Sequence, residues 1–354
     1  MEQAAVDDRP AEFFGQLEDV YTGACQKVGK QVEHDFYLAG NRFSLKFAGE
    51  ALAKQILPAL RHLQIAKEPA PADLSICFWD SVSTGQPMPP PPWRLEDCVE
   101  RGEVRGYNDD RIRTAYFLGS GVLNMLDRQR GKGVFWVRDA ANLAIWESGA
   151  PLLALLNWWF SGQERQLVHA AAVGSPEGGI LLVGKGGSGK STTALACLDS
   201  DLLYAGDDYC LLEVEPEPFV HSLYNSAKLN PDNLERFPAL GRLFALPSAR
   251  IEEKALVFLN EQVPHKLTTG FPLKGVFLPR VTGLVDTSLE PISPAVAMRA
   301  LAPSSLFQLC GAGHEGFAVM AKLIRQVPCY QLNLGTDLPG VTAAISRFLS
   351  EKQR

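Results

Sequence analysis

The amino-acid sequence predicts an α/β (α+β) fold, with a β-rich mixed N-terminal domain over residues 1–150 and a second domain over residues 151–354. Three observations support this prediction. A chain of 354 residues is long enough for two domains. Short apolar runs separated by glycine-containing turns, which are typical of strands, dominate the N-terminal half. Residues 180–193 read ILLVGKGGSGKSTT, which predicts a buried strand, a glycine-rich loop (residues 184–189) and a helix.

The composition is that of an ordinary globular protein, with 46% hydrophobic and 21% charged residues. The net charge of −6 argues against a nucleic-acid-binding protein with a broad basic face. Seven cysteines without a CxxC pair are typical of reduced thiols in a cytoplasmic protein. The N-terminus is acidic, unlike a signal peptide, and the most apolar segment, residues 150–160, is shorter than the ~20 residues that span a bilayer. We therefore expect a cytoplasmic protein that binds neither nucleic acid nor membrane.

The first elements of the N-terminal domain follow from periodicity. Apolar side chains at helical spacing predict a surface helix over residues 11–27. Two strands, residues 35–38 and 42–47, flank Ala39-Gly40-Asn41 and predict a hairpin. The next expected elements are an amphipathic helix over residues 51–63 and a strand over residues 72–79.

Residues 87–92 read PMPPPP, a run that adopts polyproline II by composition. We interpret it as a stiff surface connector, and a ligand for an SH3-like domain is the alternative. Further strands are expected at residues 113–118, 122–126, 134–137 and 142–146.

Four tryptophans of this domain could form a platform for a stacked ligand: Trp79, Trp93, Trp136 and Trp146. Large aromatic side chains in half-buried strands more often belong to the core, and we expect the core here. Residues 1–150 contain no catalytic constellation, so the sequence leaves the role of this domain open.

The second domain begins with an apolar helix over residues 151–160 that ends at Ser161-Gly162. A strand over residues 167–173 precedes the strand over residues 180–183, and the helix after the glycine-rich loop runs to Leu198. Later elements are expected as strands over residues 202–205, 275–278 and 329–334, helices over 293–309 and 338–349, and a loop over 311–315.

Residues 184–191 complete a GxxxxGK[ST] pattern. Its glycines let backbone N–H groups surround a polyphosphate, and the helix N-terminus adds partial positive charge. Lys190 is expected to reach the β- and γ-phosphates, and Ser191 to offer its hydroxyl to Mg²⁺. The expected cofactors are ATP and Mg²⁺, bound by Gly184, Lys185, Gly186, Gly187, Ser188, Gly189, Lys190, Ser191 and Thr192.

Asp207 and Asp208 follow the short strand one helix beyond the glycine-rich loop. In a βαβ unit this strand can lie beside the loop strand, with both C-terminal ends on the same edge. One carboxylate could then hold Mg²⁺ while the other acts as a base. In other contexts, two adjacent aspartates usually form a turn or a solvated loop.

Two further residues could complete the site. His169 lies on the strand before the loop strand, where a lone histidine is more often a core residue, but it could orient Asp207 and tune its basicity. Lys228, after a candidate strand, is the first choice for a cation that neutralises the transferring group, with Arg250 and Lys254 as alternatives. No other cluster suggests a metal, so Mg²⁺ is the one metal expected.

These residues carry a resemblance: residues 167–213 resemble the catalytic domain of HPr kinase/phosphorylase, a bacterial serine kinase with a fold similar to phosphoenolpyruvate carboxykinase. The resemblance implies that Asp207 is the general base, with His169 in support, and that Ser191 and Asp208 hold Mg²⁺. The chain lacks the family's Gly- and Arg-containing signature loop. It therefore looks closer to divergent relatives, some of which phosphorylate a serine of a ribosomally made peptide such as a lasso peptide precursor.

Together, the residues and the resemblance predict a kinase that transfers the γ-phosphoryl group of ATP to a hydroxyl, most often a serine of a peptide or protein partner. A kinase acting on free serine or a sugar, and a nucleotide-dependent regulatory module, are the alternatives; a carboxykinase-like lyase is more distant. The sequence does not distinguish ATP from GTP, and it leaves an oligomer open.

Overall fold

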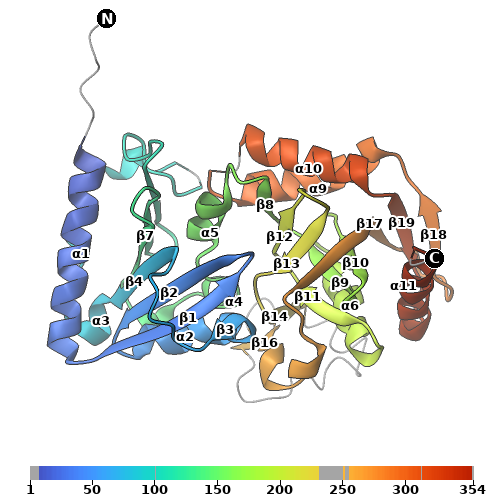
Figure 1. Ribbon diagram of the computed structural model, residues 1–354, viewed down its shortest axis with the longest axis horizontal. Helices are drawn as coiled ribbons and strands as arrows, with labels where there is room; N and C mark the ends of the chain where they lie inside the picture. The colour runs from blue at the N-terminus through green and yellow to red at the C-terminus, as the bar shows by residue number, and fades with distance from the viewer. Residues whose placement is uncertain (1–7, 100, 231–249, 252–254, 312, 353–354) are drawn as a thin grey trace, which may run out of the picture. The chain divides into compact units, whose positions relative to one another are not determined.

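The computed structural model describes residues 8–99, 101–230, 250–251, 255–311 and 313–352 (Figure 1). The chain divides into two compact units: residues 1–57 with 64–159 form unit 1, and residues 58–63 with 160–354 form unit 2. The expected α/β class is confirmed, because both larger sheets contain parallel and antiparallel strand pairs. Within the described residues, no helix combines the length and apolar character needed to cross a bilayer.

Unit 1 contains a seven-stranded sheet with the order β3-β1-β2-β4-β7-β6-β5. The predicted hairpin is confirmed, since Leu38 pairs with Asn41 and the two residues between them adopt positive φ angles of 47° and 78°. The strands are β1 (Gln31–Leu38), β2 (Asn41–Ala48), β3 (Gln64–Ile65), β4 (Leu74–Asp80), β5 (Ile112–Phe117), β6 (Val122–Asp127) and β7 (Lys132–Val137).

Helix α1 (Arg9–Val28) covers one face of this sheet and contributes Phe14 and Leu17 to a core with Trp79 and Trp136. Trp93 is also buried there, so the expectation of core tryptophans is confirmed for three of the four. Trp146 differs, because it is 57% exposed. The other helices of this part of the chain are α2 (Ala51–Leu60), α3 (Ser81–Thr84), α4 (Ile145–Gly149) and α5 (Leu153–Phe160).

The strand expected over residues 142–146 is wrong. The chain forms a 3-10 turn over Ala140–Asn142 and then helix α4. The carboxylate of Asp139 accepts a hydrogen bond from the N–H of Ala141, and this local side-chain bond offers the backbone an alternative to a strand ladder.

Unit 2 is built on a nine-stranded sheet in which β11, β9, β10, β17, β13, β12 and β8 follow one another, while β19 pairs with β17 and β18. Its strands are β8 (Arg165–Val168), β9 (Ala171–Ser175), β10 (Gly178–Leu182), β11 (Leu203–Gly206), β12 (Cys210–Glu213), β13 (Phe219–Ser222), β17 (Gly270–Val281), β18 (Ser288–Pro291) and β19 (Cys329–Leu334). A small sheet joins β14 (Ser226–Leu229), β16 (Ala255–Phe258) and β15 (Arg250–Ile251).

Helices cover both faces of the large sheet (Figure 1). Along β10, Ile180 and Leu182 pack with α6 (Lys190–Ala196) and α11 (Leu338–Lys352). The intervening Leu181 packs with α9 (Pro294–Gln308) and α10 (His314–Gln326). Since side chains alternate between the faces of a strand, a continuous apolar run is what a strand buried on both faces requires.

Three expectations for unit 2 need correction. The single strand predicted over residues 167–173 is two strands, because the chain changes partners at His169 and Ala170: β8 pairs with β12, and β9 pairs with β10 and β11. β11 therefore lies beside β9 and not beside β10. The predicted loop over residues 311–315 ends where α10 begins, at His314.

Candidate functional site

The glycine-rich loop connects β10 to α6, and its shape requires glycine. Gly184, Gly187 and Gly189 have φ angles of 140°, 78° and 105°, which other residues rarely adopt. A Cβ atom at Gly189 would also lie 2.5 Å from Cδ1 of Leu334. The loop is therefore held against β19 at Gly189.

The outermost residues of the loop are exposed to solvent, whereas Lys190, directly after the loop, is buried. Lys185, Gly186 and Gly187 are exposed, and a Cβ atom at either of these glycines would meet nothing within 4 Å. Lys190 is buried beneath them, and its Nζ donates to the carbonyl oxygens of Gly184 at 2.7 Å and Lys185 at 3.3 Å. Exposed backbone above a cation is an arrangement that suits a polyphosphate. Ser188 and Thr192, also predicted at this site, are half-buried.

The strand order brings Asp207 to this loop. β10 and β11 are both antiparallel to β9, so they run in the same direction and end at the same edge of the sheet. Asp207 follows β11, and the hydroxyl of Ser191 donates to its Oδ1 at 3.0 Å. Asp207 is 2% exposed, and its Oδ2 is buried without a hydrogen-bond partner among the described residues.

Asp208 contacts the two other predicted site residues. His169 Nε2 lies 3.1 Å from Asp208 Oδ1, and Lys228 Nζ donates to Asp208 Oδ2 at 2.8 Å. The expectation that His169 pairs with Asp207 is therefore corrected. Asp208 has a φ of 73°, which an aspartate tolerates better than most residues, and its carbonyl accepts from the N–H of Ala170 at 3.1 Å. This local conformation turns Asp208 toward the break between β8 and β9, where His169 lies.

The two carboxylates have opposite electrostatic surroundings. Burial, together with the neighbouring charge of Asp208, raises the pKa of Asp207. Burial would also raise the pKa of Asp208, but the hydrogen bond from His169 and the charge of Lys228 prevail and hold this pKa well below its usual range. Asp208 is thus a carboxylate that stays ionised, and its side chain is 27% exposed.

A magnesium ion fits this pair of donors. The unpartnered Oδ2 of Asp207 lies on the carboxylate that Ser191 already contacts, so a carboxylate and a hydroxyl oxygen are close together. Mg²⁺ prefers oxygen ligands and keeps several waters, so it needs few ligands from the protein. Among the described residues, no group of three or more His, Cys, Asp or Glu side chains could hold a metal ion.

Lys254 and the side chain of Arg250, the alternatives to Lys228, lie outside the described residues. Lys228 itself is part of β14 rather than following a strand. Ser305 on α9 also contacts the site, although the sequence did not predict it: its hydroxyl accepts a hydrogen bond from the backbone N–H of His169 at 3.0 Å. No motif marks this serine, which lies far from His169 along the chain.

No protein-family model and no curated protein sequence matches the chain. Among solved structures, the chain is similar to the Hpr(Ser) kinase/phosphatase from Coxiella burnetii. The two share 10% sequence identity with a TM-score of 0.31, over 53% of this chain and 99% of that one. This is a distant structural relation, and it supports no inference about activity.

Proposed function

We propose that the chain is an ATP-dependent phosphotransferase that moves the γ-phosphoryl group to a hydroxyl, with a serine of a peptide or protein as acceptor. One observation carries this proposal. Ser191, in the first turn of α6 after the glycine-rich loop, donates a hydrogen bond to Asp207, and Asp208 has hydrogen bonds with both His169 and Lys228. A phosphate-binding loop, two carboxylates and an additional cation are the parts that phosphoryl transfer needs.

In this proposal, residues 184–192 and the Nζ of Lys190 hold the triphosphate, and the bound Mg²⁺ neutralises its charge. The sequence-based assignment gave Asp208 to the metal and Asp207 to proton transfer. The contacts favour the exchanged assignment, because the carboxylate beside Ser191 is that of Asp207. Ser191 and Asp207 then hold the metal.

Asp208 then accepts the proton of the acceptor hydroxyl. Because its low pKa makes Asp208 a weak base, it takes this proton late, as the new bond to phosphorus forms in a loose transition state. Its side chain is partly exposed, so an acceptor hydroxyl can reach it, while His169 and Lys228 fix its position. The acceptor oxygen forms a bond to the γ-phosphorus as the bond to the β–γ bridging oxygen breaks, and the hydroxyl proton passes to Asp208. Lys228 donates a hydrogen bond to the Asp208 carboxylate, and its positive charge stabilises the negative charge on the transferring phosphoryl group.

The experiment is an isotope-transfer assay with γ-labelled ATP, Mg²⁺, a set of serine-containing peptides, and free serine. Lys228→Met is the variant, and Lys322→Met is its matched control, because Lys322 is also an ion-paired lysine of unit 2 but contacts Glu164 and Glu215 instead. Label on a peptide serine that Lys228→Met removes and Lys322→Met retains is the expected result. Label on free serine alone would favour a small-molecule kinase. Label found only as free phosphate, with or without acceptors, would contradict transfer and favour a regulatory module.

A further inference from the structure

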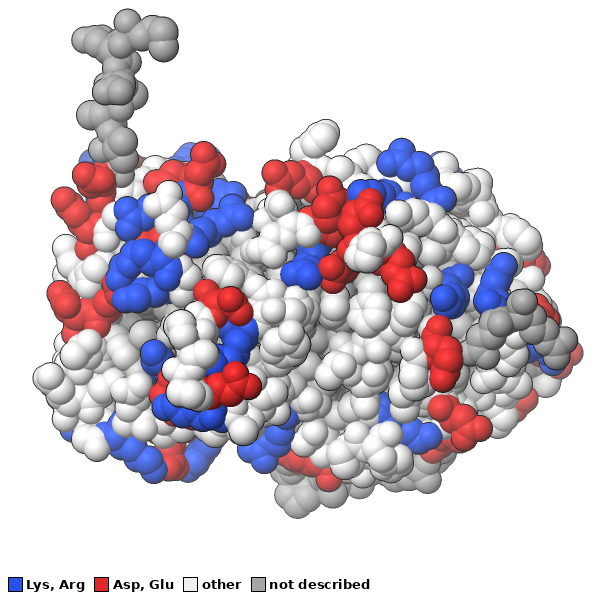
Figure 2. Space-filling model, in the orientation of Figure 1, with Lys and Arg blue, Asp and Glu red and all other residues white. Residues whose placement is uncertain are grey.

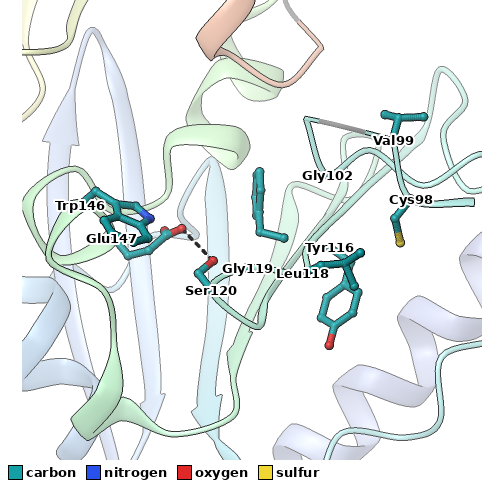
Figure 3. A pocket seen from close by; sticks show the side chains of 10 residues that line it. Cys98, Val99, Gly102, Tyr116, Leu118, Gly119, Ser120, Trp146 and Glu147 are labelled. Atoms are coloured by element: carbon teal, nitrogen blue, oxygen red, sulfur yellow. Dashed lines mark hydrogen bonds between the residues drawn. The ribbon is translucent and has the colours of Figure 1, made fainter. Parts of the chain in front are cut away.

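Unit 1 contains a hollow of about 390 Å³ that the site in unit 2 does not use. It lies where β5 ends, and helix α4 contributes Trp146 and Glu147 (Figure 3). Tyr116, Phe117 and Leu118 line it from the end of the strand. In Figure 3, Trp146 and Glu147 lie to one side of Tyr116 and Leu118, and Cys98 to the other.

Large apolar side chains are exposed around this hollow. Trp146 is 57% exposed, in contrast to the buried Trp79, Trp93 and Trp136, and Leu118 is exposed as well. Apolar side chains gathered at the mouth of a hollow are typical of a surface that another molecule covers. Of the four tryptophans that the sequence predicted in the core, Trp146 is thus the one that a ligand can reach.

Near the hollow, the edge of the sheet at β5 is no longer covered by the described part of the preceding chain. β5 is the last strand of its sheet, and the preceding chain covers it through two hydrogen bonds: Val104 N–H to Thr114 O at 3.2 Å, and Tyr116 N–H to Gly102 O at 2.7 Å. At Gly102 the covering chain turns away. A Cβ atom at Gly102 would lie 2.7 Å from the ring of Phe117, so this close turn requires glycine.

Beyond that turn, the described residues of the covering chain do not bond to two backbone groups at the end of β5. Alternate residues of an antiparallel strand direct their backbone groups to opposite sides, so the C=O of Tyr116 and the N–H of Leu118 face away from β6. Among the described residues, no hydrogen bond uses either group. An extended peptide could therefore add to the sheet edge here with two main-chain hydrogen bonds.

The negative charge of Glu147 favours a peptide with a positively charged side chain. Glu147 has the only charged side chain among the described lining residues, and the hydroxyl of Ser120 contacts its Oε1 at 3.4 Å (Figure 3). A lysine or arginine that enters the hollow would pair with Glu147 and could lie over the indole of Trp146. Because side chains of a strand alternate between its faces, an apolar residue and a cation that are two positions apart are the nearest pair that can both enter the hollow.

We propose that this hollow is a docking site for an extended peptide segment in which an apolar residue and a lysine or arginine are two positions apart. Its main chain pairs with Tyr116 and Leu118, the apolar side chain packs on Phe117 and Trp146, and the cation meets Glu147. The inference that this peptide belongs to the phosphoryl acceptor rests on the proposed function. The inference that a peptide docks here does not depend on it.

The test measures binding of a fluorescein-labelled peptide of about ten residues, with one serine and with leucine and lysine two positions apart, by fluorescence anisotropy without nucleotide. The full chain should bind it, and Trp146→Ala should weaken binding by about tenfold or more. Glu147→Gln should weaken binding of this peptide but not of a version with norleucine in place of lysine. Tyr37→Ala is the matched control, because Tyr37 is a 53% exposed aromatic residue on β1 of the same unit. It should leave binding unchanged.

Two comparison peptides test the geometry. Placing leucine and lysine at adjacent positions should weaken binding, and so should N-methylation of the residue between them, since it removes a main-chain donor. No binding at about 1 mM peptide, or equal affinities for wild type and Trp146→Ala, would overturn the docking site. If the peptide binds but accepts no label from ATP, docking holds and the kinase proposal fails. If it accepts label with the same KM in wild type and Trp146→Ala, the kinase proposal holds and docking fails.

Discussion

Asp207 and Asp208 are adjacent in sequence, yet one is buried beside Ser191 and the other is partly exposed between His169 and Lys228. The positive φ of Asp208 separates them, because it reverses the local direction of the chain. The sequence predicted both carboxylates near the glycine-rich loop and paired His169 with Asp207. The actual pair is His169 and Asp208, and it depends on one backbone dihedral that no motif encodes.

This difference predicts separable effects of two conservative substitutions. Asp208→Asn removes the proposed base, so kcat should fall by about 10²–10⁴-fold while the Mg²⁺ concentration for half-maximal activity stays the same. Asp207→Asn removes a proposed metal ligand, so the Mg²⁺ requirement should rise by about tenfold or more. Steady-state kinetics over a Mg²⁺ titration measures both quantities. The reverse pattern would restore the assignment made from the sequence.

At the scale of single elements, apolar residues at helical spacing predicted α1, turn residues predicted the β1–β2 hairpin, and a continuous apolar run predicted β10. The break between β8 and β9 was not predictable in the same way. His169 and Ala170 interrupt an apolar run because the chain passes from one set of partner strands to another, and partner choice is a property of the whole sheet. The strand expected over residues 142–146 failed for the opposite reason, since a local bond from Asp139 decided the structure.

The glycine-rich loop offers a matched pair of glycine substitutions. Gly189 has a φ of 105°, and an added Cβ atom would lie 2.5 Å from Leu334, whereas Gly186 has neither restriction. Gly189→Ala should lower the free energy of unfolding by about 1–3 kcal/mol and weaken nucleotide binding, because the strained position must shift. Gly186→Ala should leave the thermal midpoint (Tm) unchanged. Differential scanning fluorimetry with and without ATP measures both, and an equal Tm for the two variants would contradict the role given to Gly189.

At the scale of the whole molecule, positive and negative side chains are interspersed over the described part of the face shown in Figure 2.

The chain does not divide at one point, because residues 58–63 belong to unit 2 although they lie within the N-terminal part of the sequence. The side-chain amide of Asn225 donates to the carbonyl oxygens of Pro58 and Ala59 at 2.8 and 2.9 Å. A composition shift marks where a chain changes character, so it cannot reveal a short segment of the N-terminal part that belongs to the second unit.

This segment predicts how the stability of unit 2 depends on pH. His62 lies on it, and its Nε2 is 2.7 Å from the hydroxyl of Ser222. Burial lowers the pKa of His62 to about 3. In the unfolded chain the same side chain takes up a proton near its ordinary pKa of about 6.5. Between these two values the unfolded state binds more protons than the folded state, so this group makes unit 2 less stable as the pH falls from about 6.5 toward 3.

His62→Gln removes this proton uptake, so the Tm of the variant should fall less steeply than that of wild type between about pH 7 and pH 4. The limiting contribution of one such group is about 1.4 kcal/mol for each pH unit. His265→Gln is the control, because His265 is an exposed histidine of the same unit and its replacement should leave the slope unchanged. Parallel slopes for wild type and His62→Gln would mean that His62 can be protonated without leaving its place beside Ser222. The segment would then be held by the carbonyl contacts to Asn225 and not by a neutral histidine.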